Sequence, residues 1–130
     1  MSVEEMRLEI IRLTNIERAN AGAPEVAALP ALMDCAQAKA RDFLDNRYYG
    51  HISPKYGTPT QMILSFVPDA RVCGENLATW TVTPQDVVAG WMESPSHRAT
   101  LLATKFTHIG VGAVVDENGG MCWVQQFAGF

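Results

Sequence analysis

The side chains in this sequence that could do chemistry are isolated histidines and glutamates. His51 lies in a loop rich in Gly, Ser and Pro, where the backbone rather than a helix face sets the side-chain position. Glu75 lies inside an apolar run, and a buried carboxylate is costly unless a histidine, a metal ion or a hydrogen-bond donor compensates it. His97 follows Ser-Pro-Ser at the expected start of a helix. The Gly-x-Ser-x-Gly, His-Glu-x-x-His and phosphate-binding glycine motifs are absent.

If these groups converge, two chemistries are open. Two imidazoles and one or two carboxylates suit Zn²⁺ or a similar divalent ion, held weakly and with an open coordination position. The same groups could instead act as a general acid/base pair. Glu93 precedes His97 by four residues, but Pro95 intervenes, so the two need not share a helix face. Each site residue also has a plainer interpretation as a solvated side chain, and His108 is interpreted as a surface strand residue.

Local sequence signals predict five helices and a C-terminal pair of strands around these residues. Ser2 with Glu5, and Thr58 with Gln61, have the pattern of capping boxes. Asn-Gly between two β-rich runs indicates a hairpin. The predicted helices cover residues 3–21, 30–49, 59–66, 84–93 and a short segment from 95, and the predicted strands cover 107–115 and 121–127. Residues 72–78 form a short, apolar and partly extended run. Helices followed by a hairpin indicate an α+β fold.

Periodicity also predicts which faces are buried. The apolar stripe of the first helix comprises Val3, Met6, Ile10, Leu13 and Ile16. In the second helix Cys35 lies on the apolar stripe, whereas Lys39 lies mostly on the other, polar side. Gly110 and Gly112 leave one face of their strand without side chains, which indicates that another element packs closely there.

The composition is that of one globular domain over residues 1–130. Hydrophobic residues make up 48% and charged residues 18% of the chain, which excludes intrinsic disorder. The net charge of −4 and the scattered Lys and Arg argue against nucleic acid or an anionic membrane as partner. No apolar run reaches the ~20 residues of a membrane-spanning helix. No signal peptide is recognisable, so the protein is either cytosolic or has lost its leader.

Several phrases, taken in order, resemble the bacterial branch of the CAP superfamily, the SCP-like extracellular domains that include cysteine-rich secretory proteins. The phrases are Gly50-His51-Ile52-Ser53-Pro54, Gly74-Glu75-Asn76-Leu77-Ala78, Trp91-Met92-Glu93-Ser94-Pro95-Ser96-His97-Arg98, Ile109-Gly110-Val111-Gly112 and Trp123-Val124-Gln125-Gln126-Phe127. The resemblance covers about residues 6–127. It implies an α-β-α sandwich, with a small antiparallel sheet between helical layers and residues 72–78 as a third strand.

The resemblance also implies a cavity lined by two histidines and two acidic residues. His51, Glu75 and His97 match three of these positions. The fourth position corresponds to Ser94, and Glu93 lies one residue short of it, so Glu93 is the candidate for the fourth metal ligand. In a hydrolase, Glu75 and His97 would be the catalytic residues.

The function that the resemblance implies is a secreted or cell-surface binding module rather than an enzyme. Its histidine/glutamate cavity would hold Zn²⁺, another divalent cation or a small ligand. The alternatives are a metal-assisted or acid/base hydrolase of the peptidase type, and a carrier of lipid or sterol. A carrier groove would draw on Met62, Phe66, Trp80 and Met92, which at this spacing are more often core residues. The expected partner is a small molecule, a lipid or a cell-surface ligand, and the expected state is a monomer.

The three cysteines divide into two groups. Cys35 is expected to be a free thiol in the core. Cys73 and Cys122 lie on two of the predicted strands, and neighbouring strands could bring them within the ~4–7 Å Cα separation that a disulfide needs. Two alternatives remain open: Cys73 and Cys122 form a disulfide, or both are free thiols.

Overall fold

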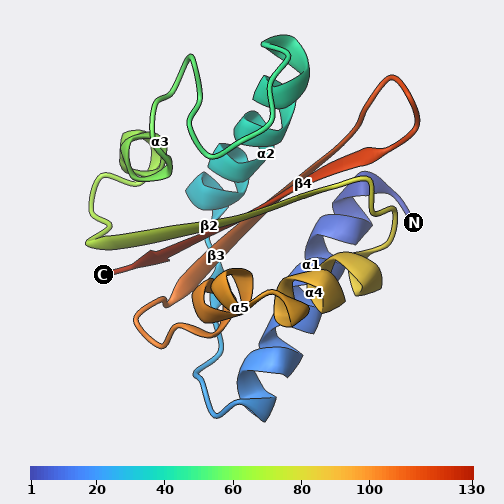
Figure 1. Ribbon diagram of the computed structural model, residues 1–130. Helices are drawn as coiled ribbons and strands as arrows, with labels where there is room; N and C mark the ends of the chain where they lie inside the picture. The colour runs from blue at the N-terminus through green and yellow to red at the C-terminus, as the bar shows by residue number, and fades with distance from the viewer.

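The computed structural model describes all 130 residues. The chain folds into a sheet that lies between two layers of helices (Figure 1). The helices are α1 (Val3–Asn20), α2 (Pro30–Asp45), α3 (Pro59–Phe66), α4 (Pro84–Glu93) and α5 (Pro95–Leu102). The strands are β1 (Ala27–Ala28), β2 (Val72–Thr79), β3 (His108–Val115) and β4 (Met121–Gly129). Helices α2 and α3 lie on one side of the sheet, and α1, α4 and α5 lie on the other (Figure 1). The predicted α-β-α sandwich is confirmed.

The sheet has the strand order β1-β3-β4-β2. Strand β4 pairs antiparallel with both β2 and β3, and the register places Glu75 opposite Gln126. Strand β1 pairs parallel with β3 through Ala27 and Ala28, so the sheet is mixed rather than purely antiparallel. Strand β1 was not predicted, because alanine has a low strand propensity and two residues carry no periodicity.

Local capping signals were interpreted correctly at both predicted capping boxes. The Ser2 hydroxyl accepts from the Glu5 amide while the Glu5 carboxylate accepts from the Ser2 amide, and Thr58 and Gln61 repeat this arrangement at α3. The end of α2 was predicted wrongly, because the helix stops at Asp45 rather than near residue 49. The chain turns there through Arg47, whose φ of 51° lies in the left-handed region.

Helix α2 packs against the backbone of β3 at two glycines. A Cβ atom at Gly110 would lie 2.1 Å from the carbonyl oxygen of Leu32, and one at Gly112 would lie 2.1 Å from that of Ala36. Any side chain at either position would push the helix away from the sheet. The close packing expected from these glycines is confirmed.

The opposite face of the sheet carries the larger core cluster, in which Ile10, Trp91 and Trp123 are almost fully buried. The predicted stripe of α1 is correct in part, because Val3, Met6 and Leu13 pack against this cluster. Ile16 was placed wrongly, since 43% of it is exposed. Arg18 is buried instead, and its guanidinium donates hydrogen bonds to the carbonyl oxygens of Pro24, Leu101, Ala103 and Phe106.

The edge of β3 beyond β1 is covered by side chains. Gln37 donates to the carbonyl of Ala113 and accepts from its amide, both at 2.9 Å. The Arg7 guanidinium donates to the carbonyl of Val111 at 2.7 Å. These contacts satisfy groups that an exposed strand edge would offer to another chain.

Of the two arrangements left open for Cys73 and Cys122, the structure has the free thiols, because all three cysteines are unbridged. Cys73 lies opposite Ala128, whereas Cys122 lies opposite Thr79, six residues further along β2. At about 3.3 Å per residue, this offset separates the two cysteines by roughly 20 Å. Cys35 is fully buried, as predicted.

None of the five helices combines the length and the apolar character that a membrane crossing requires.

The packing of α2 on β3 predicts opposite effects for two glycine-to-alanine variants. Gly112→Ala should lower the free energy of unfolding by about 1–3 kcal/mol or more, because the methyl group overlaps the Ala36 carbonyl. Gly90→Ala is the matched control, because open space surrounds that position in α4. This control should raise the free energy of unfolding by up to about 1 kcal/mol through helix propensity. Urea denaturation measures both, and equal effects would contradict the packing argument.

Candidate functional site

The His51 loop is fixed to α2 by a buried lysine. The Lys39 ammonium donates to the carbonyl oxygen of His51 at 2.7 Å and lies over the rings of Phe43 and Tyr48 at 5.3 and 5.1 Å. Only 1% of Lys39 is exposed, which corrects its prediction on the polar side of the helix. Burial lowers the pKa of Lys39, and the carboxylate of Glu75 opposes this shift. The lysine therefore ties the backbone of His51 to the helix.

Asp42, one helical turn after Lys39, holds the rest of the loop. Its carboxylate accepts hydrogen bonds from Asn46, Tyr48 and Ser53. Burial raises the pKa of Asp42, but these three hydrogen bonds outweigh burial, so the pKa lies below its ordinary value. The structure therefore stabilises an ionised carboxylate beneath the loop.

The Ser53 hydroxyl extends this contact into the loop itself. Its oxygen accepts from the amides of Lys55 and Tyr56 at 3.0 and 2.9 Å while its hydrogen points to Asp42. Ser53 also pairs with Gly57 as an isolated bridge. The segment that presents His51 is thus a braced turn rather than a free loop.

The central contact of the site joins His51 to Glu75 on β2. The Nδ1 atom of His51 lies 2.9 Å from Oε1 of Glu75. An ionised carboxylate can only accept, so Nδ1 carries the proton. The His51 side chain is 51% exposed and the Glu75 side chain 1% exposed. The buried carboxylate therefore orients an imidazole whose other nitrogen, Nε2, is free to meet a ligand.

Glu75 is also held from inside the sheet. The Nε2 atom of Gln126, directly opposite on β4, donates to Oε2 of Glu75 at 2.9 Å. Both carboxylate oxygens thus have a partner, which offsets the cost of burying the charge. Glu75 is therefore paired, as its apolar surroundings in the sequence indicated, rather than turned to solvent.

His97 reaches β2 through its backbone rather than its ring. The Asn76 side chain donates to the His97 carbonyl and to Oε1 of Gln125, both at 3.0 Å, and Gln125 donates to Thr14 at 2.9 Å. This buried line of polar groups links α5, β2, β4 and α1. His97 itself lines a shallow cleft with Trp91.

The remaining candidates lie apart from the His51–Glu75 pair. Glu93 is exposed at the end of α4 and has no ion pair. His108 is half-buried, and its Nδ1 lies 2.8 Å from the Thr107 hydroxyl. No group of three or more His, Cys, Asp or Glu side chains is arranged to hold a metal ion. The structure thus brings together two of the four predicted residues.

Four residues that shape the site were not predicted from the sequence. They are Lys39, Asp42, Asn76 and Gln126. Asn76 and Gln126 lie within the phrases that carried the family resemblance, which is a signal that could have identified them. Lys39 and Asp42 follow one another at helical spacing, and only knowledge of the loop above them shows that they are buried.

Comparison with known proteins gives one consistent result. The sequence matches the family described as "CAP: Cysteine-rich secretory protein family" over residues 11–127. It is 41% identical over 128 residues to the "Uncharacterized protein YkwD" of Bacillus subtilis, covering 98% of this chain and 49% of that protein. The chain thus spans about half the length of this curated relative.

Two solved structures share the fold. One is an extracellular protein containing an SCP domain from Bacillus anthracis, with a TM-score of 0.86 and 29% identity over all of this chain and 44% of that one. The other is an outer surface protein from Borrelia burgdorferi, with a TM-score of 0.89 and 22% identity over 99% of this chain and 96% of that one.

The contacts of Asp42 predict a pH-dependent loss of stability. At neutral pH, Asp42→Asn should lower the free energy of unfolding by about 1–3 kcal/mol, because one of the two carboxylate oxygens becomes an NH2 group that cannot accept the hydrogen bonds donated to it. A carboxyl whose pKa is lowered by folding stabilises above its unfolded pKa and loses this effect as the pH falls. The difference from the natural protein should therefore shrink below about pH 4.

Urea denaturation between neutral pH and a pH below about 4 measures the difference in the free energy of unfolding. Asp69→Asn is the control, because Asp69 is exposed and its side chain makes no hydrogen bond or ion pair. A difference between Asp42→Asn and the natural protein that does not change with pH would contradict the role given to this carboxylate.

Proposed function

Because the chain belongs to the cysteine-rich secretory protein (CAP) family, we propose that it is an extracellular, non-catalytic binding domain whose ligand contacts Nε2 of His51. The observation that carries the proposal is the 2.9 Å contact between Nδ1 of His51 and the buried Glu75 carboxylate. This contact fixes the ring orientation and engages Nδ1, so the half-exposed imidazole presents Nε2 to its surroundings.

An extracellular or cell-surface location is part of the proposal. The family is described as secretory, and the 29% identical relative from Bacillus anthracis is described as an extracellular protein. These descriptions support the location. The three free cysteines do not conflict with it, because all three are at least half covered by the fold.

A divalent cation such as Zn²⁺ is the ligand class that this nitrogen suits best. Metal-binding histidines commonly donate their second ring N–H to a carboxylate, and His51 and Glu75 have this arrangement. Structural and catalytic zinc sites use three or four protein ligands. Here only one candidate ligand, His51, has its ring held in place by a carboxylate. His97 and Glu93, the other candidate ligands, would have to move, so binding should be weak.

A form of the hydrolase alternative with a serine nucleophile would need a serine hydroxyl that is free to meet His51. Ser53 is the serine nearest His51 in the chain, and its hydroxyl is engaged by Asp42 and by two loop amides. Activation of a serine requires a hydrogen bond to a base such as histidine. The contacts of Ser53 therefore argue against acyl transfer through this serine, and hydrolysis by an activated water is tested by the substrate screen below.

The carrier alternative needs one groove lined by the proposed apolar residues. Met62 lies in the core cluster under α3, whereas Met92 packs against the cluster on the opposite face of the sheet. Trp80 is 71% exposed in the connection between β2 and α4. The sheet separates these side chains, so the structure favours a polar ligand at His51 over a lipid among them.

Zinc titration tests the proposal directly. Calorimetry at neutral pH should show weak binding of Zn²⁺, above the micromolar range, that disappears in His51→Ala and weakens in Glu75→Gln. His108→Ala is the matched control, because this histidine lies apart from the pair, and it should leave the heat unchanged. Equal binding by His51→Ala and the natural protein would contradict a role for His51.

A substrate screen tests the non-catalytic part of the proposal. The purified protein should hydrolyse no member of a panel of peptides and esters faster than the Glu75→Gln variant does. Hydrolysis that is present in the natural protein and absent from Glu75→Gln would instead establish the acid/base alternative.

A further inference from the structure

A cavity lies where the end of α2 faces the β3–β4 hairpin. Its volume is about 580 Å³, within the range of small-molecule sites. It shares no lining residue with the His51–Glu75 pair. The lining residues come from the last turn of α2 and the segment after it, from the hairpin turn, and from the start of β4; they are Phe43, Leu44, Arg47, Tyr48, Asp116, Glu117, Asn118 and Cys122.

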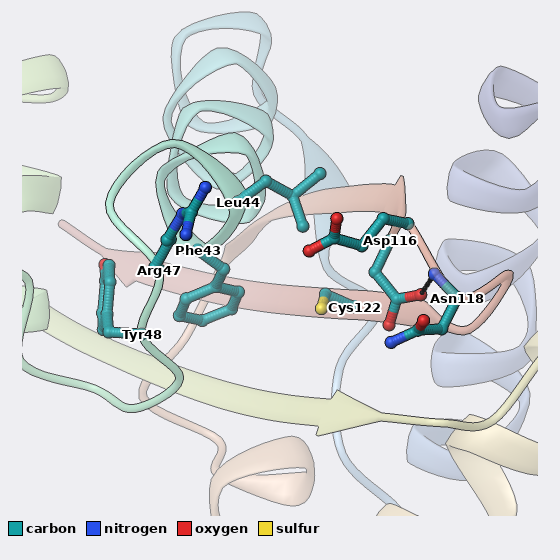
Figure 2. A pocket seen from close by; sticks show the side chains of 8 residues that line it. Phe43, Leu44, Arg47, Tyr48, Asp116, Asn118 and Cys122 are labelled. Atoms are coloured by element: carbon teal, nitrogen blue, oxygen red, sulfur yellow. Dashed lines mark hydrogen bonds between the residues drawn. The ribbon is translucent and has the colours of Figure 1, made fainter.

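Charges of opposite sign lie at the two ends of this cavity. In Figure 2, Arg47 and Tyr48 lie at one end and Asp116 and Asn118 at the other, with Phe43 and Cys122 between them. Phe43 and Cys122 are buried beneath the cavity, and Leu44, another lining residue, is 39% exposed. A cationic end, an apolar floor and an acidic end therefore follow one another.

The fold does not use these charges itself. Arg47 takes part in none of the three ion pairs of the protein and donates no side-chain hydrogen bond. Glu117 likewise has no partner. Asp116 uses Oδ1 to accept from the amides of Asn118 and Gly120, while Oδ2 accepts from neither. The guanidinium and both carboxylates thus remain available to a ligand.

The cationic end is held in place by the same contacts that brace the His51 loop. Arg47 has a left-handed backbone with φ of 51°, and the residues on either side, Asn46 and Tyr48, both donate to Asp42. The Tyr48 ring also packs edge-on against Phe43, with centroids 5.1 Å apart. A strained residue over-determined by its neighbours is typical of a functional position.

We propose that this cavity binds a short peptide with free ends, with the peptide carboxylate on Arg47 and the peptide ammonium on Asp116 and Glu117. Guanidinium groups bind carboxylates through paired hydrogen bonds. A dipeptide or tripeptide extends over about 7–10 Å, which a cavity of this volume accommodates. An apolar side chain of the peptide would cover Phe43, Leu44 and Cys122. The carboxylates disfavour a purely anionic ligand such as a phosphate ester.

The test uses the dipeptide Leu-Leu and its two blocked forms, N-acetyl-Leu-Leu and Leu-Leu-amide, titrated into ¹⁵N-labelled protein. Leu-Leu should shift the backbone resonances of residues 43–48 and 116–122. Each blocked form should bind about tenfold more weakly, because it loses one charged contact. Arg47→Gln should bind Leu-Leu and Leu-Leu-amide equally, and Glu117→Gln should weaken the preference for Leu-Leu over N-acetyl-Leu-Leu.

The controls are Arg71→Gln and Asp69→Asn, two exposed residues outside the cavity, which should leave binding unchanged. Native-like spectra of each variant show that it is folded. Equal binding of free and blocked peptides, shifts confined to other residues, or the absence of shifts at saturating peptide would each overturn the proposal. None of these results bears on His51, because neither the cavity nor the variants include it.

Discussion

The close packing of α2 on the glycines of β3 is the constraint on which the candidate site depends. With no side chain at Gly110 and Gly112, the carbonyls of Leu32 and Ala36 rest directly on the strand. This contact sets the height and the rotation of α2 above the sheet. The next turn of the helix then lies over the sheet face that carries Glu75, and its last turn reaches the hairpin. The positions of both the His51 site and the cavity beside the hairpin therefore depend on this one contact.

Three charged side chains are buried between α2, the loop that covers it and the sheet. Lys39, Asp42 and Glu75 are all at most 8% exposed, and each charge has several partners in hydrogen-bond distance or close electrostatic contact. Burying such groups rarely adds to stability compared with apolar residues of the same size, whereas removing one partner is costly. Their effect here is positional, because together they fix where the His51 backbone and ring can lie.

The extent to which the sequence predicted this structure follows from how local each signal is. The capping boxes depend on residues three apart in the sequence, and the glycine pair of β3 is itself visible as missing side chains on one strand face. Both were predicted. Lys39 was placed on the polar side of its helix and Asp42 was not singled out, because charged positions on a helix are usually solvated. Both are buried only because residues 46–57 fold back over the helix. Gln126 depends on the register of β2 and β4, which no single segment of the sequence contains.

The alternation of side chains along β2 explains why the motif residues do not form one cluster. Successive residues of a strand point to opposite faces. Glu75 therefore faces α2 and meets the ring of His51, while Asn76 faces α5 and holds the backbone of His97. The two histidines approach the same edge strand from opposite layers of the sandwich. Strand β2 has no partner strand on its outer side. A ligand bound at His51 would therefore lie at the same strand that contacts α5. There Asn76 connects α5 to the chain of polar groups that ends at Thr14.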